Sequence, residues 1–214
     1  MAGKKSSVDE KMTTREKIIW ESLRLFCKNG YEGVSIREIA ATVGIKGASI
    51  YNHFKSKEAI FHAIFEEMTK QYSQIANDIH LPQVINETSI QDFANMEEEQ
   101  LQQMADGLLQ FYTQNEFVVM FRRMIVSEQF RTSIAAKYYK EYYLEAPFLF
   151  QKQIFEGIQK CGGFNNYDAD IMALHFYSPI YYILSRYDAG SSLDECKILI
   201  KKHIHTFVQL YSGG

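Results

Sequence analysis

Apolar residues recur with the period of an α-helix along nearly all of this 214-residue chain, whereas sustained alternation of apolar and polar residues is almost absent. Helices with apolar faces bury those faces by packing on one another. The chain has only three prolines, Pro82, Pro147 and Pro179, so long helices are possible. We therefore expect an all-α fold.

Two capping boxes near the N-terminus predict where the first two helices begin. Each pairs a hydroxyl residue with a glutamate three positions later; the pairs are Thr13 with Glu16 and Ser35 with Glu38. Asn29-Gly30 is expected to end the first helix, and Gly44 to end the second after about two turns.

A third, brief helix is expected from Gly47 to Phe54, in which only Ile50 and Phe54 are spaced to face a core. Ser56 can then cap a long helix, which Pro82 prevents from continuing unbroken. Two short helices joined by a glycine-containing turn and braced by longer helices predict a helix-turn-helix motif. Such a motif places its second short helix in the major groove of DNA.

The charge distribution favours the same interpretation. Residues 1 to 65 carry a net charge of +4, the remainder carries −7, and the whole chain carries −3. A positive module on a negative body attracts polyanionic DNA at one end only. Lysines at the second short helix add to this charge: Lys46, Lys55 and Lys57.

The run "GYEGVSIREIAATVGIKGASIYNHFKSKEAIF" resembles the DNA-binding domain of the tetracycline-repressor (TetR) family of bacterial regulators. The resemblance covers about a quarter of the chain, from about Thr14 to Ile64. It implies that the third helix reads a palindromic operator, with Tyr51 and Lys57 gripping phosphate. It implies DNA contacts by Ser35, Lys46, Gly47, Ala48, Ser49, Tyr51, Asn52, His53 and Lys57. We add Lys55 to these candidate DNA contacts, because its charge lies beside them.

The chain is therefore expected to divide into an N-terminal arm (1–12), a DNA-binding domain (13–65) and a ligand-binding and dimerisation domain (66–214). In the last, periodicity and breaks predict helices at Ser89–Thr113, Asn115–Phe130, Thr132–Leu144, Pro147–Cys161, Asp168–Asp188 and Leu193–Tyr211.

This third region is unusually aromatic. Of the 29 phenylalanines and tyrosines, 20 lie between Phe93 and Tyr187. Such a bundle is either a solid core or a pocket for a flat apolar ligand, and the family resemblance implies a pocket. The candidate ligand-binding residues are Met104, Leu108, Phe111, Tyr112, Phe117, Met120, Phe121 and Met124, with Tyr138 and Tyr142 adding hydroxyls. Arg122 and Arg123 can counter a negative charge, but adjacent helical positions diverge by about 100°, so one of them is expected to face solvent.

Broad apolar coverage on the last two expected helices predicts a homodimer with a two-fold four-helix interface, which the resemblance also implies. The expected interface residues are Ile171, Leu174, Ser178, Tyr182, Cys196, Leu199, Ile200, His203, Phe207 and Leu210. A dimer also strengthens DNA binding, because two linked helices read two half-sites.

Other classes of function find little support. There is no catalytic, cofactor or metal-binding motif, and the three cysteines are far apart in sequence, so we expect neither an enzyme nor a cofactor. No apolar run reaches membrane-spanning length, and we expect a cytoplasmic protein. The remaining alternative is a DNA-binding protein without an inducer, controlled by a protein partner. The single tryptophan, Trp20, lies off the apolar stripe of its helix and has no role in this scheme.

Overall fold

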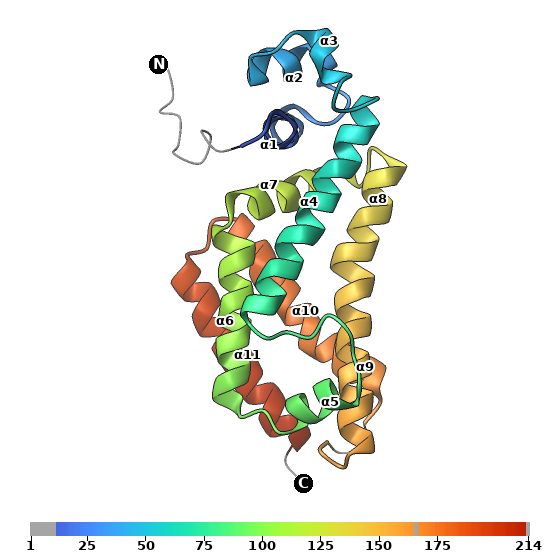
Figure 1. The fold of residues 1–214 in the computed structure, drawn as a ribbon. Helices are drawn as coiled ribbons and strands as arrows, with labels where there is room; N and C mark the ends of the chain where they lie inside the picture. The colour runs from blue at the N-terminus through green and yellow to red at the C-terminus, as the bar shows by residue number, and fades with distance from the viewer. Residues whose placement is uncertain (1–11, 165–166, 213–214) are drawn as a thin grey trace.

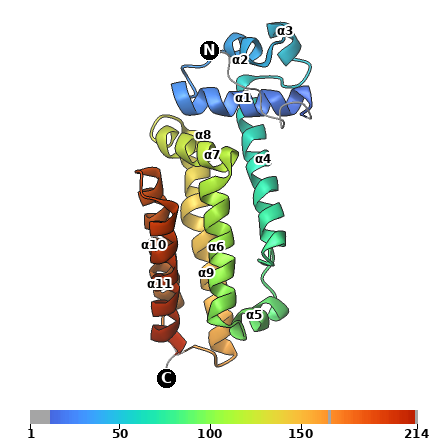
Figure 2. The ribbon, with the colours of Figure 1, turned by 90° about the vertical axis from the view of Figure 1, so that its left-hand side faces the viewer.

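The computed structural model describes residues 12–164 and 167–212, so nearly all of the expected N-terminal arm lies outside the described residues. Within the described ranges every regular element is a helix and none is a strand, which confirms the all-α prediction. Helices α1 to α3 form one end of an elongated molecule, and the other helices form a body below them (Figures 1 and 2).

The predicted capping boxes are present and start the first two helices, α1 (Thr14–Asn29) and α2 (Ile36–Val43). Gly44 ends α2 with φ = +81°, a left-handed conformation that glycine adopts without steric cost. The predicted helix from Gly47 to Phe54 is shorter than expected, because α3 (Gly47–Ile50) is a single turn followed by a hydrogen-bonded turn. Asn52 and His53 are weak helix formers, and nothing buries them to compensate.

Helix α4 (Lys57–Asp78) starts beside α3 and runs down along the body (Figure 2). The predicted helix Ser89–Thr113 is wrong as a single element, because the chain forms α5 (Glu87–Ala94) and α6 (Glu98–Gln114). Asn95 caps the end of α5, and a new capping box at Glu97 begins α6. Periodicity continued across this break and concealed it.

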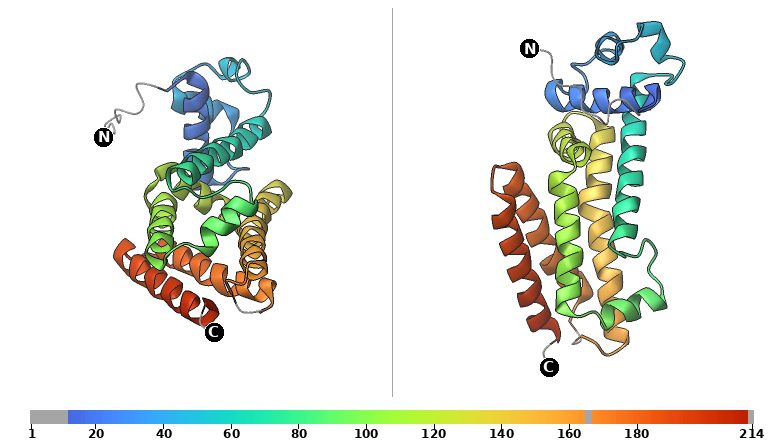
Figure 3. Two further views of the ribbon diagram at one scale, coloured as in Figure 1. Left: turned by 60° about the horizontal axis from the view of Figure 1, so that its bottom comes forward. Right: turned by 60° about the vertical axis from the view of Figure 1, so that its left-hand side comes forward.

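The body is completed by a second set of helices. These are α7 (Glu116–Glu128), α8 (Ser133–Tyr139), the π-helical segment η1 (Lys140–Glu145), α9 (Ala146–Lys160), α10 (Ala169–Asp188) and α11 (Leu193–Ser212). Figure 3 shows α10 and α11 side by side along one flank of the body, away from α4.

The expected break between Leu144 and Pro147 does not occur, because α8, η1 and α9 form one continuous helical rod (Figure 1). A proline inside a helix removes a hydrogen bond to the carbonyl four residues before it. Here that carbonyl, on Tyr143, accepts a hydrogen bond of 2.7 Å from the Tyr177 hydroxyl on α10. The π-helical turn and this tertiary contact accommodate the proline without ending the rod.

The apolar core is continuous between the end formed by α1 to α3 and the body. One cluster of buried side chains includes Phe26 of α1, Phe61 of α4 and Phe121 of α7. Helix α1 packs on α7 as well as on α2 and α4. The two predicted domains therefore share a core, through which a change in one can reach the other.

Candidate nucleic-acid interface and ligand site

Two buried side chains hold α3 and the turn after it against the core. Ile50 is fully buried and Phe54 is 5% exposed, and they are the residues predicted to face inward. The side chains between and beside them point outward, and Tyr51 is 59% exposed. Those of the predicted DNA contacts that are exposed are Ser35, Lys46, Ala48, Tyr51, Asn52, His53 and Lys55, while Gly47 and Ser49 are half-buried. The fold thus presents this set of groups at the tip of the molecule (Figure 1).

Lys57 is held differently from the other two lysines of this surface. Its Nζ donates hydrogen bonds to the carbonyls of Tyr31 (2.9 Å) and Val34 (3.0 Å) and lies 4.3 Å from the centre of the Tyr31 ring. The side chains of Lys46 and Lys55 are exposed and make no hydrogen bond or ion pair with the described part of the chain. The Lys57 ammonium therefore ties the start of α4 to the turn between α1 and α2.

Ser35 is also committed within the domain. Its hydroxyl donates to the Glu38 carboxylate (2.8 Å) and accepts from the Glu38 backbone N–H (3.2 Å). The Ser35 backbone N–H, followed by this hydroxyl, lowers the pKa of Glu38. The side chain expected to contact DNA is thus also the group that fixes the start of α2.

Trp20 lies at the joint between α1 and the body, which explains its place off the apolar stripe. Its ring meets the buried ring of Phe117 on α7 edge-on, with centroids 5.1 Å apart. Arg24 lies over the Trp20 ring at 5.7 Å and pairs with Glu116 at 3.1 Å. The sequence contained no signal for this contact, because it joins two helices about a hundred positions apart.

The hydroxyls of Tyr138 and Tyr142 bind α4. The Tyr138 ring stacks on Phe65 with centroids 3.6 Å apart, and its hydroxyl lies 3.0 Å from Nδ1 of His62. The Tyr142 hydroxyl is hydrogen-bonded to Thr69. These two residues connect the α8–η1 rod to α4, and their hydroxyls are not available to a ligand without breaking those bonds.

The other predicted ligand residues fall into two clusters of the core. Phe111, Phe117, Phe121 and Met124 belong to the shared core, with Tyr112 and Met120 packed against it. Met104 and Leu108 belong to a separate cluster around Ala76 and Leu81, further along the body. Much of the aromatic content of α6 and α7 is therefore packing.

A buried ion pair connects α7 to the end of α10. Arg122 is 2% exposed and donates from Nε and Nη2 to the two Asp188 oxygens at 2.7 and 2.8 Å. Burial opposes the charge of Arg122, but the Asp188 carboxylate raises its pKa overall. Arg123 is exposed, as one of the two arginines was expected to be.

Four tyrosines that the helical pattern did not single out as a group come together beside this ion pair, from four different helices. They are Tyr72 (α4), Tyr112 (α6), Tyr143 (η1) and Tyr177 (α10). Tyr143 is 3% exposed, and its hydroxyl has no hydrogen-bond partner in the described part of the chain. Burial raises the pKa of each of these phenols, so all four are protonated at neutral pH.

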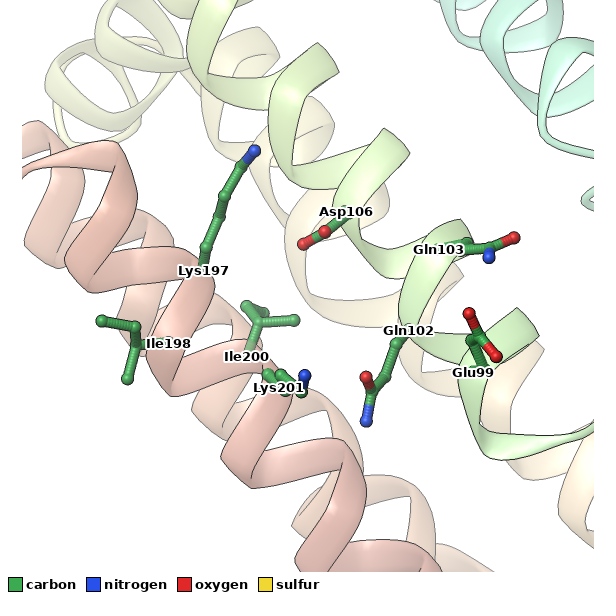
Figure 4. Close-up of a pocket in the computed structure, with 8 residues that line it drawn as sticks. All are labelled: Glu99, Gln102, Gln103, Asp106, Lys197, Ile198, Ile200 and Lys201. Carbon is green, nitrogen blue, oxygen red and sulfur yellow. The ribbon is translucent and has the colours of Figure 1, made fainter.

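Two grooves lie on the outer surface of the body. Figure 4 shows the larger, of about 390 Å³, where Lys197 and Lys201 of α11 face Glu99 and Asp106 of α6. Its charged walls do not suit an apolar ligand. The smaller, of about 270 Å³, lies between α10 and α11 and is lined by Pro179, Tyr182, Ile183, Leu199, Lys202, His203 and Thr206.

The α10–α11 flank exposes several large apolar side chains. Those from 48% to 61% exposed are Ile171, Leu174 and Tyr182 on α10 and Ile198 and Leu210 on α11. Of the other predicted interface residues, Ser178 is exposed and Leu199 and His203 are half-buried. Cys196, Ile200 and Phe207 lie inside the protomer, each at most 4% exposed, which corrects their expected place on the outer face. The stripe on α11 has two apolar sides, and sequence periodicity did not separate the inner from the outer.

Among the described helices, none is both long and apolar enough to span a bilayer. The same part of the chain holds no group of three side chains arranged to bind a metal ion.

Comparison with known proteins addresses the helix-turn-helix directly. Residues 18–64 match the family model described as bacterial regulatory proteins, tetR family. Residues 18–64 are therefore similar to the domain that this family model describes. This domain begins within α1, includes α2 and α3, and ends in the first part of α4.

Curated relatives match the TetR-family domain alone. The uncharacterized regulator YerO of Bacillus subtilis is 50% identical over 46 residues, which are 22% of this chain and 16% of YerO. IcaR of Staphylococcus aureus, a negative transcriptional regulator of the biofilm operon icaADBC, is 45% identical over 47 residues, 22% of this chain and 25% of IcaR. The match thus spans a quarter or less of each of these relatives.

The fold extends the similarity to the whole chain. SmeT of Stenotrophomonas maltophilia, the repressor of a multidrug efflux pump, solved with triclosan, matches with a TM-score of 0.69 and 15% identity. The match covers 94% of this chain and 92% of SmeT. The body attached to the TetR-family domain therefore has the fold of a known regulator.

Proposed function

We propose that this protein is a dimeric, cytoplasmic transcriptional repressor that binds a palindromic operator through α3 and is released by a small, largely apolar ligand. The observation that carries the proposal is the match of residues 18–64 to the tetR model, on a fold that leaves the polar side chains of the turn after α3 exposed. The names of IcaR and SmeT, a negative regulator and a repressor, favour repression.

In this proposal the side chains of α3 and of the segments on either side of it have two roles. Lys46, Tyr51 and Lys55 contact phosphate, because they are long and have no partner within the described chain. Ser49, Asn52 and His53 read base edges in the major groove, where short hydrogen-bonding side chains at this place on a recognition helix reach. Lys57 and Ser35 act first on the shape of the domain, through their intramolecular hydrogen bonds.

The dimer forms through the α10–α11 flank. Its exposed apolar residues lie on two adjacent helices, and a second copy related by a two-fold axis buries the same residues on both sides. Helix α3 lies at one end of the elongated molecule (Figure 2), so a two-fold axis that runs along its length brings the two recognition helices to the same end of the dimer.

Release follows from the connections between body and DNA-binding end. Helix α4 belongs to both, and Tyr138 and Tyr142 hold it to the α8–η1 rod. The Trp20–Phe117 contact forms a second connection through α1. A ligand that separates these helices tilts α4 and changes the distance between the two recognition helices, so that they no longer fit successive half-sites.

The test is fluorescence anisotropy of a labelled duplex from upstream of the protein's own gene, with a scrambled duplex as control, across a salt series. We expect tight, sequence-selective binding, and Asn52→Ala or Ser49→Ala should change the base preference rather than affinity alone. Equal, weak binding to several upstream duplexes and to the control would refute the repressor. Selective binding that no small molecule releases would favour control by a protein partner.

A further inference from the structure

Several phenol hydroxyls inside the body lack hydrogen-bond partners, and their position indicates the kind of molecule that the body binds. Tyr143 is almost completely buried and its hydroxyl has no partner. The Tyr72 and Tyr112 hydroxyls also make no hydrogen bond with any described residue. A buried hydroxyl without a partner costs about 1–3 kcal/mol, so the fold retains the Tyr143 hydroxyl at a cost in stability, while Tyr72 and Tyr112 are only half-buried.

These hydroxyls belong to one region of the core. Tyr72 and Tyr112 both contact the ring of Phe111, at 6.4 and 5.2 Å between centroids. Tyr143 is joined to α10 by the hydrogen bond between its carbonyl and the Tyr177 hydroxyl. Arg122 closes the region by donating to the Tyr112 carbonyl while it pairs with Asp188. Four helices and the π-helical turn therefore meet around these phenols.

The charges and hydroxyls of this region determine which net charge and which polar group a ligand can have. Arg122 is the buried cation here, and its Nε and Nη2 both donate to Asp188, so the buried pair has no net charge. Arg123 also lies 3.6 Å from this carboxylate, but its side chain is exposed to solvent. An anionic ligand would lose its hydration without gaining an unpaired cation. A neutral phenol can both donate and accept a hydrogen bond, and the O–H of Tyr143 has no acceptor in the described part of the chain. Tyr143 belongs to the same apolar cluster as Phe111, Phe121 and Met124, and Ile75 packs against that cluster.

We propose that the body binds an uncharged, flat, mostly apolar molecule whose carbonyl oxygen accepts a hydrogen bond from Tyr143, with Tyr72 and Tyr112 as the neighbouring donors. This inference rests on the ligand-binding part of the proposed function and names its chemical class. It also replaces Tyr138 and Tyr142 as the source of ligand-binding hydroxyls, since those two are bonded to His62 and Thr69.

The test compares two probes of similar size, 2-acetonaphthone and 2-ethylnaphthalene, in which a carbonyl group in the first takes the place of a methylene group in the second. Binding is measured by isothermal titration calorimetry on the wild type, Tyr143→Phe and the matched control Tyr138→Phe. We expect the wild type and Tyr138→Phe to bind the ketone about ten-fold more tightly than the hydrocarbon, which is the effect of one good hydrogen bond. Tyr143→Phe should bind both probes equally.

Tyr143→Phe keeps the buried ring and removes an unpaired hydroxyl, so it should unfold at a temperature no lower than that of the wild type. Equal binding of both probes to the wild type would overturn the role of Tyr143 while leaving an apolar ligand site in place. Binding of neither probe at its solubility limit would overturn the ligand class. Operator binding, measured separately by anisotropy on the same samples, shows whether the DNA-binding function stands in either case.

Discussion

Lys57 offers the sharpest test of how the DNA-binding end is built, because its ammonium group has partners inside the protein. Replacing it in Lys57→Met keeps the apolar stem and removes two hydrogen bonds to the Tyr31 and Val34 carbonyls, of 2.9 and 3.0 Å, and a contact with the Tyr31 ring. A hydrogen bond to a charged group contributes roughly 1.5–3 kcal/mol when buried, and less at this half-exposed site.

We therefore expect Lys57→Met to lower the free energy of unfolding by about 2 kcal/mol. For a chain of this size that corresponds to a decrease in Tm of about 4–8 °C, measured by circular dichroism. The matched control is Lys55→Met, two positions earlier, whose ammonium has no partner in the described chain. Its Tm should not change.

The two variants should differ in their effects on DNA binding: Lys55→Met should change its salt dependence, and Lys57→Met should change its sequence selectivity. A lost phosphate contact reduces the slope of log K against log salt by about 0.9 per protomer, and we expect this for Lys55→Met. Lys57→Met should keep the wild-type slope and lose selectivity for the operator over a scrambled duplex, because the turn that positions α2 and α3 is loosened. An unchanged Tm together with a smaller slope for Lys57→Met would refute this reasoning and return Lys57 to the phosphate-gripping role implied by the family resemblance.

Three further predictions concern the body. Leu174→Glu should convert the dimer to a monomer in sedimentation velocity, because it places a charge on the α10–α11 flank. The control Leu149→Glu, at a residue that is also 50% exposed but lies on α9, should leave the dimer intact. Dissociation of both variants would indicate a different interface. Burial lowers the pKa of His203, so protonation favours the unfolded chain, and the free energy of unfolding should fall as the pH drops below about 6.5. His203→Gln should flatten that decrease in urea titrations between pH 5 and 7.5; an equally steep profile would assign it to another group. Asp188→Asn leaves Arg122 buried without its counterion and should lower the free energy of unfolding, measured in urea titrations, by about 3 kcal/mol. Adding Arg122→Met to this variant should recover a large part of that loss. A loss under 1 kcal/mol would show that the pair is not buried in solution.

Local signals in the sequence were sufficient to predict most helix ends and the inward-facing residues in the part of the molecule formed by α1 to α3. The capping boxes at Thr13 and Ser35 and the glycine at position 44 fix helix ends through contacts three or four residues long, and the structure contains them as expected. Ile50 and Phe54 also face inward as their spacing predicts. The length of α3 was overestimated, because a single turn depends on the core beneath it more than on its own residues.

In the body, local sequence signals did not predict every helix break or which helix faces are buried in the protomer. Pro147 suggested a break that the structure does not have, since the Tyr177 hydroxyl from α10 satisfies the Tyr143 carbonyl that the proline leaves free. Cys196, Ile200 and Phe207 lie on the apolar stripe of α11 but face the protomer core. Periodicity shows that a helix has an apolar face, and it does not show which neighbour covers that face.

The sequence by itself determined the all-helical class, the helix-turn-helix and the residues at its tip, because these depend on helix period, capping and charge within short stretches of chain. Only the tertiary structure decided that Lys57 clamps a turn, that Trp20 joins α1 to Phe117 on α7, and that Tyr143 keeps a buried hydroxyl without a partner. Each of these depends on groups brought together from positions distant in sequence, and helix packing, which sets those distances, is not encoded in any local pattern.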